Sequence, residues 1–321
     1  MRSILFRCDS SNQIGLGHVT RSLAFAQAFV DKNWKVTFFG NFNNPSWLNN
    51  LIIKQKNISF ENIQSEHVFK QRYDLVVVDS YTIESNEFDK LSTVGKKSVS
   101  IIDDISPELN TNFYTSSLPY EYLPKFKSIK DGLFGPKYAL IRQEITNAPK
   151  FSNRVHASPR SVALFLGGSL NTEFAELILN QLISKVNDRK IKIFSNDNQL
   201  KLKYENITSL VFILPKTEFF NELFDVDLVI APASVSSWEF LCMGFPLSIY
   251  GIHENQLSTY KYLVENNYAR GLGVVSNYHE FVLDINQLDN ALNGPAKLGI
   301  RTELIDGFGS SRVYEEIINN L

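Results

Sequence analysis

The stretch SILFRCDSSNQIGLGHVTRSLAFAQAFVD, residues 3–31, decides the fold. Its apolar start at residues 3–7 predicts a strand, and Gly15 and Gly17 predict a tight turn. The apolar spacing from residue 17 to residue 31 predicts a helix. A strand that passes through a glycine-rich turn into a helix opens a βαβ unit, so a parallel sheet is expected.

The same alternation continues along the chain and then restarts. Apolar, β-branched runs, typical of parallel strands covered on both faces, occur at residues 36–39, 75–78 and 98–102. After a polar, aperiodic segment at residues 147–160, further runs occur at residues 161–166, 190–194, 209–214, 227–230 and 246–250. The pattern predicts an α/β protein with two doubly wound, Rossmann-like domains.

The domain boundaries follow from that polar segment. We predict a first domain at residues 1–148, a linker at 149–160 and a second domain at 161–321. Residues 309–321 carry apolar side chains on one helical face, and we allow this last helix to pack back on the first domain.

Composition narrows the function. The 321 residues are 44% hydrophobic and 21% charged, with a net charge of −2 and dispersed basic residues, so neither nucleic acid nor a membrane is an expected partner. The cysteines, Cys8 and Cys242, lie far apart and outside any metal-binding spacing. The cysteines indicate a reduced, cytoplasmic setting. We also expect a monomer that acts on a small molecule and needs no cofactor.

The first loop is the candidate for chemistry. The dinucleotide-binding motif G-x-G-x-x-G needs a third glycine after Gly15 and Gly17, but Thr20 stands at that position. A dinucleotide site is therefore disfavoured. His18 falls in the first turn of the expected helix, whose positive end should lower the pKa of the imidazole and keep it neutral. The alternative is a histidine that only caps or packs.

The second domain offers a phosphate site. After the run at residues 227–230 comes a turn of small and hydroxyl residues at an expected helix N-terminus, where a pyrophosphate can bind: Ser234, Val235, Ser236 and Ser237. Glu239, one turn on, can accept both hydroxyls of a ribose. Alternatively, Ser236 and Glu239 form a capping box.

Two further turns are candidates. Gly167 and Gly168 follow the run at residues 161–166. They form either a turn whose backbone can closely approach a ligand or an ordinary strand-to-helix turn. Asn255 and Gln256 begin an expected helix and can hydrogen-bond acetamido or hydroxyl groups, unless they are simply solvated. The pair Asp103 and Asp104 lacks a third ligand, so no metal site is predicted.

Several segments together carry a family resemblance. LFRCDSSNQIGLGHVTRSL, YDLVVVDSYTI, FLGGS, APASVSSWEFLCMGFP, ENQ and DGFGSSRV occur in that order. The chain resembles the pseudaminic acid pathway's UDP-sugar hydrolases, the PseG family, which hydrolyse UDP-2,4-diacetamido-2,4,6-trideoxy-β-L-altropyranose and are related to MurG-type glycosyltransferases of the GT-B fold.

The resemblance implies a mechanism and a site. It implies a GT-B-like fold with a ligand cleft between the domains, and inverting, metal-independent cleavage of the sugar C–O bond. His18 matches the family's general base, and Tyr81 matches a cleft tyrosine. Gly15, Gly17 and Arg21 would then line the substrate.

Alternatives stay open at this point. A GT-B glycosyltransferase with the same donor site, or a UDP-sugar-binding protein without catalysis, fits the same domain pattern. The loop APASVSSWE stands where the family often has a glycine-rich sequence. The sugar and the nucleotide base therefore remain open.

Overall fold

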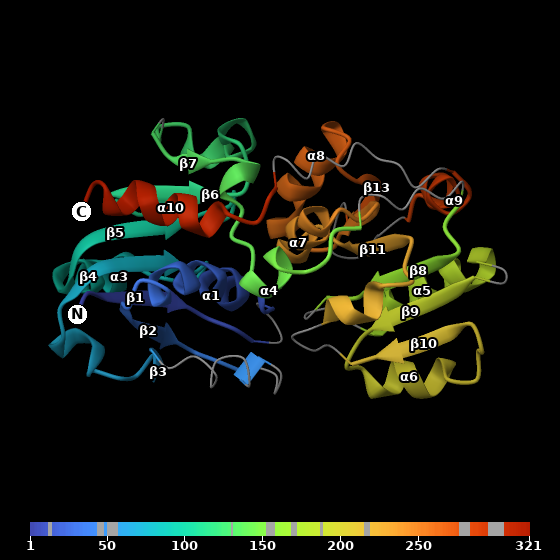
Figure 1. Ribbon diagram of the computed structural model, residues 1–321, viewed down its shortest axis with the longest axis horizontal. Helices are drawn as coiled ribbons and strands as arrows, with labels where there is room; N and C mark the ends of the chain where they lie inside the picture. Colours follow the sequence, from blue (N-terminus) through green and yellow to red (C-terminus); the bar gives the residue numbers. More distant parts are fainter. Residues whose placement is uncertain are drawn as a thin grey trace. The chain divides into compact units, whose positions relative to one another are not determined.

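The computed structural model describes residues 1–11, 15–43, 48–49, 57–129, 131–151, 158–167, 172–186, 189–214, 219–275, 283–294 and 305–321. The chain divides into two compact units, Met1–Thr146 with Leu304–Leu321, and Asn147–Glu303. Each unit contains one parallel sheet flanked by helices (Figure 1). Each is described separately below.

The first unit contains a seven-stranded sheet in the order β3-β2-β1-β4-β5-β6-β7, with every neighbouring pair parallel. The chain order reverses between β1 and β4, and ligands of open α/β sheets bind at such a switch point. The register there sets Cys8 opposite Asp79, so both strands end together. The strands are β1 (Ser3–Cys8), β2 (Lys35–Gly40), β3 (Ile58–Asn62), β4 (Tyr73–Asp79), β5 (Gly95–Ile101), β6 (Phe113–Ser116) and β7 (Leu133–Phe134).

Alternating side chains of β1 pack into separate cores on the two faces of this sheet. Ile4 and Phe6 pack with Phe25 of α1 (Gly17–Val30). Leu5 packs on the other face with Leu91 of α3 (Ser85–Val94). This burial on both faces explains why these strands are apolar along their whole length.

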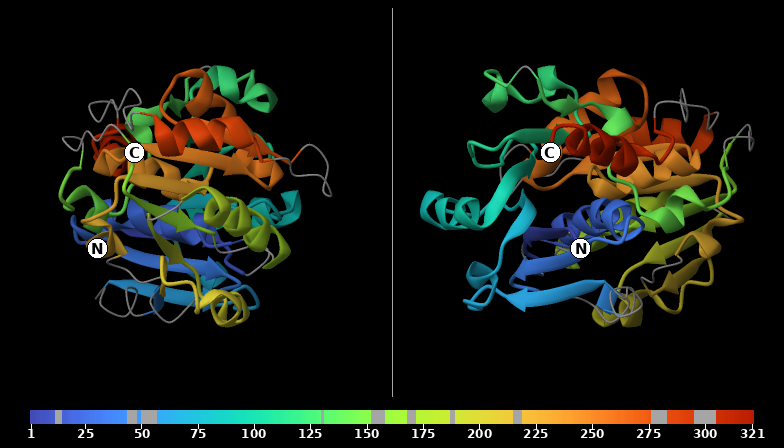
Figure 2. Two further views of the ribbon diagram at one scale, coloured as in Figure 1. Left: turned by 90° about the vertical axis from the view of Figure 1, so that its right-hand side faces the viewer. Right: turned by 60° about the vertical axis from the view of Figure 1, so that its left-hand side comes forward.

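The C-terminal helix α10 (Gly309–Ile318) also belongs to this unit. Its Val313 and Ile317 are fully buried in the core on the α1 face, and the Tyr314 and Phe29 rings lie 4.9 Å apart. Figure 2 shows this helix, in red, from two further directions. Chain segments about 290 residues apart in the sequence are thus packed side by side.

The second unit repeats the topology with six parallel strands in the order β10-β9-β8-β11-β12-β13. Its switch point lies between β8 and β11. The strands are β8 (Ser161–Phe165), β9 (Lys190–Phe194), β10 (Leu210–Ile213), β11 (Leu228–Pro232), β12 (Leu247–Gly251) and β13 (Arg270–Val274). The helices are α5 (Thr172–Val186), α6 (Asn198–Tyr204), α7 (Val235–Met243), α8 (Leu257–Glu265) and α9 (Ile285–Asn293).

The prediction of two doubly wound sheets is confirmed. The sequence pattern missed β3, β6, β7 and β13, which lie at or near the sheet edges. Of these, β3, β6 and β13 contain polar or glycine residues, as in ISFEN and RGLGV, and β7 has only two residues. Asp227 precedes β11 and accepts hydrogen bonds from the backbone N–H groups of Arg160 and Ser161.

None of the described helices is long and apolar enough to cross a membrane.

Candidate active site

Three carboxylates meet the carboxyl edge of the first sheet around its switch point. Asp9 follows β1, Asp79 ends β4 and Asp103 lies just beyond β5. They are 4%, 1% and 7% exposed. Because buried carboxylates are costly without partners, each must be held by cations or hydrogen-bond donors.

The glycine-rich turn starts α1 beside these carboxylates. Gly15 has a φ of 81°, a left-handed conformation that suits glycine, and its N–H donates to the Ser11 carbonyl at 2.7 Å. Gly17 is the first residue of α1, so His18 and Arg21 lie one turn apart near the same helix end. The structure therefore brings these four predicted site positions together in one segment.

Arg21 is bound to Asp79. Its Nε donates to Asp79 Oδ2 at 2.8 Å, its Nη2 donates to the other oxygen, and Ser22 Oγ donates to Oδ2 at 3.0 Å. Such a two-pronged pair fixes the planes of both groups. Its Nη1 lies 3.5 Å from Asp103 Oδ2, so Arg21 connects two of the three carboxylates.

His18 is surrounded by this network but is not bonded to it. Its Nε2 lies 3.9 Å from Asp79 Oδ1, too far for a hydrogen bond, and neither ring nitrogen has a partner among the described residues. The side chain is 5% exposed. Burial lowers the pKa of His18 and outweighs the attraction of Asp79, so the imidazole is neutral at pH 7.

The direction of that shift matches the sequence expectation, but the main cause differs. Burial, rather than the positive helix end, dominates the lowered pKa of His18. The ring is buried beside the Asp79 carboxylate and the Tyr81 ring. The imidazole therefore lies buried at the carboxyl edge of the first sheet.

Tyr81 packs against His18. The two ring centroids are 4.2 Å apart at an angle of 75°, an edge-to-face contact. The Tyr81 hydroxyl donates to Asp103 Oδ2 at 2.5 Å. The Tyr81 ring therefore packs against one side of the imidazole, and Asp103 fixes the Tyr81 hydroxyl.

Asp9 has its own cation, Arg7. The Arg7 Nη1 lies 2.6 Å from Asp9 Oδ2, and Arg7 Nε donates to Glu87. Asp9 also accepts from Ser80 Oγ at 3.3 Å and from the Asn41 N–H at 2.8 Å. Asp9 thus ties together the loops that follow β1, β2 and β4.

At the second switch point, Gly167 follows β8 with a φ of 80°. A Cβ atom at Gly167 would lie 3.2 Å from Pro232 Cγ, at the end of the neighbouring strand β11. The turn is therefore tight. Gly168 lies outside the described residues.

Helix α7 begins at Val235, which makes Ser234 its N-cap residue. The Ser234 N–H donates to Ser237 Oγ at 3.3 Å, and Ser237 Oγ donates to the Pro232 carbonyl at 2.9 Å. The capping box thus pairs Ser234 with Ser237, not Ser236 with Glu239 as the alternative required.

This arrangement separates the residues of the turn by exposure. Ser234, Val235 and Ser236 are half-buried, whereas Ser237 and Glu239 are 0% and 4% exposed. The first N–H groups of a helix have no partner within it and favour anions. Val235 and Ser236 are accordingly the best placed of the group to meet a phosphate.

Asn255 and Gln256 lie in a short 3₁₀ turn, Glu254–Gln256, and precede α8 rather than begin it. Gln256 is 7% exposed, and its Oε1 accepts from the Ile252 N–H at 2.9 Å. The side-chain oxygen of Gln256 is therefore already used to stabilise the loop after β12.

Two features of the site escaped the sequence analysis. Asp79 was not singled out, although a polar residue directly after an apolar strand beside the glycine-rich loop was a usable signal. Asp103 was considered only as a metal ligand; in the structure it accepts from Tyr81 and Ser106. Among the described residues, no cluster of three or more His, Cys, Asp or Glu side chains is placed to hold a metal.

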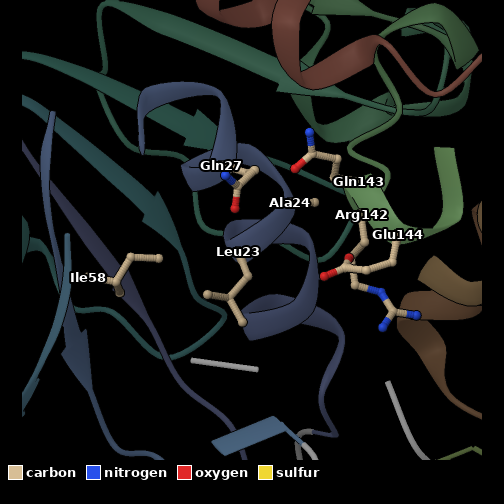
Figure 3. A pocket seen from close by; sticks show the side chains of 7 residues that line it. All are labelled: Leu23, Ala24, Gln27, Ile58, Arg142, Gln143 and Glu144. Atoms are coloured by element: carbon tan, nitrogen blue, oxygen red, sulfur yellow. The ribbon is translucent and has the colours of Figure 1, made fainter. Parts of the chain in front are cut away.

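A small pocket elsewhere on the first unit contains none of the predicted site residues (Figure 3). It is lined by Leu23, Ala24 and Gln27 of α1, by Ile58 and by residues 142–144. The lining residues that belong to α1 lie in later turns of that helix, whereas His18 lies in its first turn. The pocket is thus separate from the histidine site.

The chain is similar in sequence to one characterised enzyme. It is 30% identical over 231 residues to the UDP-2,4-diacetamido-2,4,6-trideoxy-β-L-altropyranose hydrolase of Campylobacter jejuni subsp. jejuni serotype O:2. The match covers 65% of this chain and 81% of that protein. No family model matches the chain.

Solved structures share the fold. Acinetobacter baumannii MurG superposes with a TM-score of 0.61 at 12% identity, over 99% of this chain and 100% of that one. The glycotransferase of kitacinnamycin gives 0.63 at 15% identity, over 100% and 99%. At such identities only the fold is shown, and it is GT-B-like with two doubly wound domains.

Proposed function

The chain belongs to the family of UDP-2,4-diacetamido-2,4,6-trideoxy-β-L-altropyranose hydrolases, and on that premise we propose that it is a UDP-sugar hydrolase. The substrate is this UDP-sugar or a close diacetamido relative. Water attacks the anomeric carbon, the bond from that carbon to the UDP oxygen breaks, and the products are UDP and the free sugar. Attack opposite the leaving group inverts the anomeric configuration.

One observation carries this proposal: the His18 imidazole is buried at the switch point of the first sheet, with neither nitrogen bonded among the described residues. Burial lowers the pKa of His18, which favours the neutral ring. A neutral imidazole can accept the proton of the attacking water, whereas an imidazolium cannot. General-base catalysis by one residue contributes roughly 10²–10⁴-fold.

The second unit supplies groups for the leaving UDP. The half-buried turn of Ser234, Val235 and Ser236 opens α7, whose N-terminal N–H groups and hydroxyls suit a diphosphate. The tight turn at Gly167 after β8 is the candidate for backbone contact with a phosphate, and Glu239 is the candidate for the ribose. Asn255 and Gln256 are candidates for the sugar's acetamido groups. Proton transfer and charge neutralisation then need no metal.

The first test replaces His18 by Asn. Turnover should fall by at least about 100-fold because the base is lost, while UDP binding, measured by calorimetry, should stay within about twofold. His67→Asn is the matched control, since His67 is exposed and lies in a short turn ahead of β4. Wild-type turnover in His18→Asn would contradict the role of His18.

Isotope labelling tests which bond breaks. Hydrolysis in ¹⁸O-water should place the label in the free sugar and none in UDP, because attack is at carbon. Label in the phosphate would instead indicate cleavage at phosphorus and overturn the proposed step.

A GT-B glycosyltransferase is the second candidate, because the fold is shared with glycosyltransferases such as MurG. It would use the same donor groups and would pass the sugar to an acceptor hydroxyl. Incubating the pure protein with the UDP-sugar alone separates the two. UDP release without an acceptor supports the hydrolase, and release only on adding an acceptor supports the transferase.

A further inference from the structure

The polar groups around His18 leave one negative charge unbalanced. Arg21 is the only cation that contacts Asp79 and Asp103 among the described residues, so two carboxylates share one guanidinium. Asp79 and Asp103 are almost fully buried, so solvent screens this excess weakly. An additional positive charge beside them would be stabilised.

His18 is placed to provide that charge. Its Nε2 is 3.9 Å from Asp79 Oδ1, about 1 Å beyond hydrogen-bond distance. When the ring gains a proton, the group of His18, Arg21, Asp79 and Asp103 becomes neutral. The site is thus balanced for the imidazolium that forms during proton abstraction, and not for the resting imidazole.

Asp103 also acts on His18 through Tyr81. The Tyr81 hydroxyl is held by Asp103 Oδ2 at 2.5 Å, and the Tyr81 ring lies against the imidazole. Asp103 Oδ1 in turn accepts from Ser106 Oγ at 3.2 Å and from the Ile105 N–H at 3.3 Å. Both oxygens of Asp103 are therefore occupied, and the tyrosine ring is fixed in place.

We propose that Asp79 and Asp103 are positioning residues for His18: Asp79 stabilises the imidazolium directly, and Asp103 supplies the second negative charge and holds Tyr81 against the ring. The kinetic part of this inference rests on the proposed hydrolase function. Arg21 offsets one of the two negative charges and so adds to the effect of burial, which is the main cause of the lowered pKa of His18. In this arrangement Arg21 serves the base rather than a phosphate.

The test measures the titration of His18 by NMR in Asp79→Asn and Asp103→Asn, without any substrate. The chain has five histidines, and His18→Asn identifies the His18 signal. Within the part of the chain that the structure describes, four charged groups act on the ring: Arg21 from α1, Asp79 from β4, Asp103 after β5, and Asp9 after β1, which is paired with Arg7.

The pKa of His18 should fall below the wild-type value in both variants. Removing a carboxylate disfavours the imidazolium, and in Asp79→Asn the unopposed Arg21 adds to this effect. Asp103→Asn leaves the pair of Arg21 and Asp79 intact, so it decides the matter if Asp79→Asn does not fold.

Asp74→Asn is the matched control. Asp74 lies near the start of the same strand, β4, where it accepts from the Ser3 N–H at 2.9 Å and pairs with Lys96 at 2.6 Å. The His18 pKa should be unchanged there. An unchanged pKa in folded Asp103→Asn, or an equal fall in Asp74→Asn, would overturn the proposal.

Kinetics then extend the result to catalysis. With the UDP-sugar, kcat should fall about tenfold or more while KM stays within about twofold, because the lost stabilisation belongs to the charged transition state. The acidic limb of the kcat profile should move to lower pH, since a base with a lower pKa stays deprotonated further into acid. A wild-type protein that releases no UDP would contradict the proposed function alone, because the titration needs no substrate.

Discussion

At the scale of single residues, burial sets the state of His18. The side chain is 5% exposed, and burial disfavours its charged form more than Asp79 favours it. In the proposed hydrolase, a base that is neutral at rest and close to carboxylates meets both needs of proton abstraction: it can accept the proton, and the positive charge it acquires is stabilised.

A residue-scale prediction concerns Gly167. Gly167→Ala should cost about 1–2 kcal/mol of unfolding free energy, because its φ of 80° is strained for alanine. The new methyl group would also press on Pro232 and should weaken UDP binding. Urea unfolding and calorimetry measure the two effects.

Gly135→Ala is the control for this change. Its φ is 107°, but an added Cβ would meet nothing within 4 Å, and it lies in the first unit. It should lower stability without changing UDP affinity. Equal losses of UDP affinity in both variants would contradict a role for the Gly167 turn at the phosphates.

At the scale of elements, helix starts carry the site. The glycine-rich turn begins α1, and a turn of small and hydroxyl residues begins α7. Both helices begin beside the strands of a switch point, at the carboxyl end of their sheet. The two sheets therefore offer similar ligand positions with different side chains.

An element-scale prediction separates capping from binding in α7. Ser237→Ala should lower the free energy of unfolding by about 1–3 kcal/mol, because the buried Ser237 Oγ accepts from the Ser234 N–H and donates to the Pro232 carbonyl. Ser236→Ala should change stability by less than about 0.5 kcal/mol yet weaken UDP binding. A larger stability loss in Ser236→Ala than in Ser237→Ala would contradict the observed capping contacts.

At the scale of the whole molecule, two separate cores support the two sheets. The core of the first unit includes the C-terminal helix, and the core of the second is built around β8, β9 and α5. Each core has its own buried apolar side chains, so a destabilising substitution in one core should increase local unfolding in that unit alone.

Ile317→Ala tests this independence. Loss of a fully buried side chain should cost about 2–5 kcal/mol and should speed amide exchange in α1 and β1 while leaving β8 and β9 unchanged. Glu316→Ala, on the exposed face of the same helix, is the control and should have no such effect. Faster exchange in both units would argue against separate cores.

The sequence by itself determined the two doubly wound sheets, because buried parallel strands must be apolar and the turns between strand and helix need small residues. It also placed the glycine-rich turn, with His18 on the helix that follows. Short strands such as β6 and β7 were not predictable, since four- and two-residue pairings leave no periodic pattern.

Only the tertiary structure decided which charges meet. Arg21, Asp79 and Asp103 span 82 residues of sequence, and their contact arises because parallel strands end at one edge. The same holds for the capping partner of Ser234 and for α10, whose place on α1 depends on the Phe29 and Tyr314 contact. Local pattern specifies where strands and helices form, whereas the pKa of His18 depends on groups that only folding brings together.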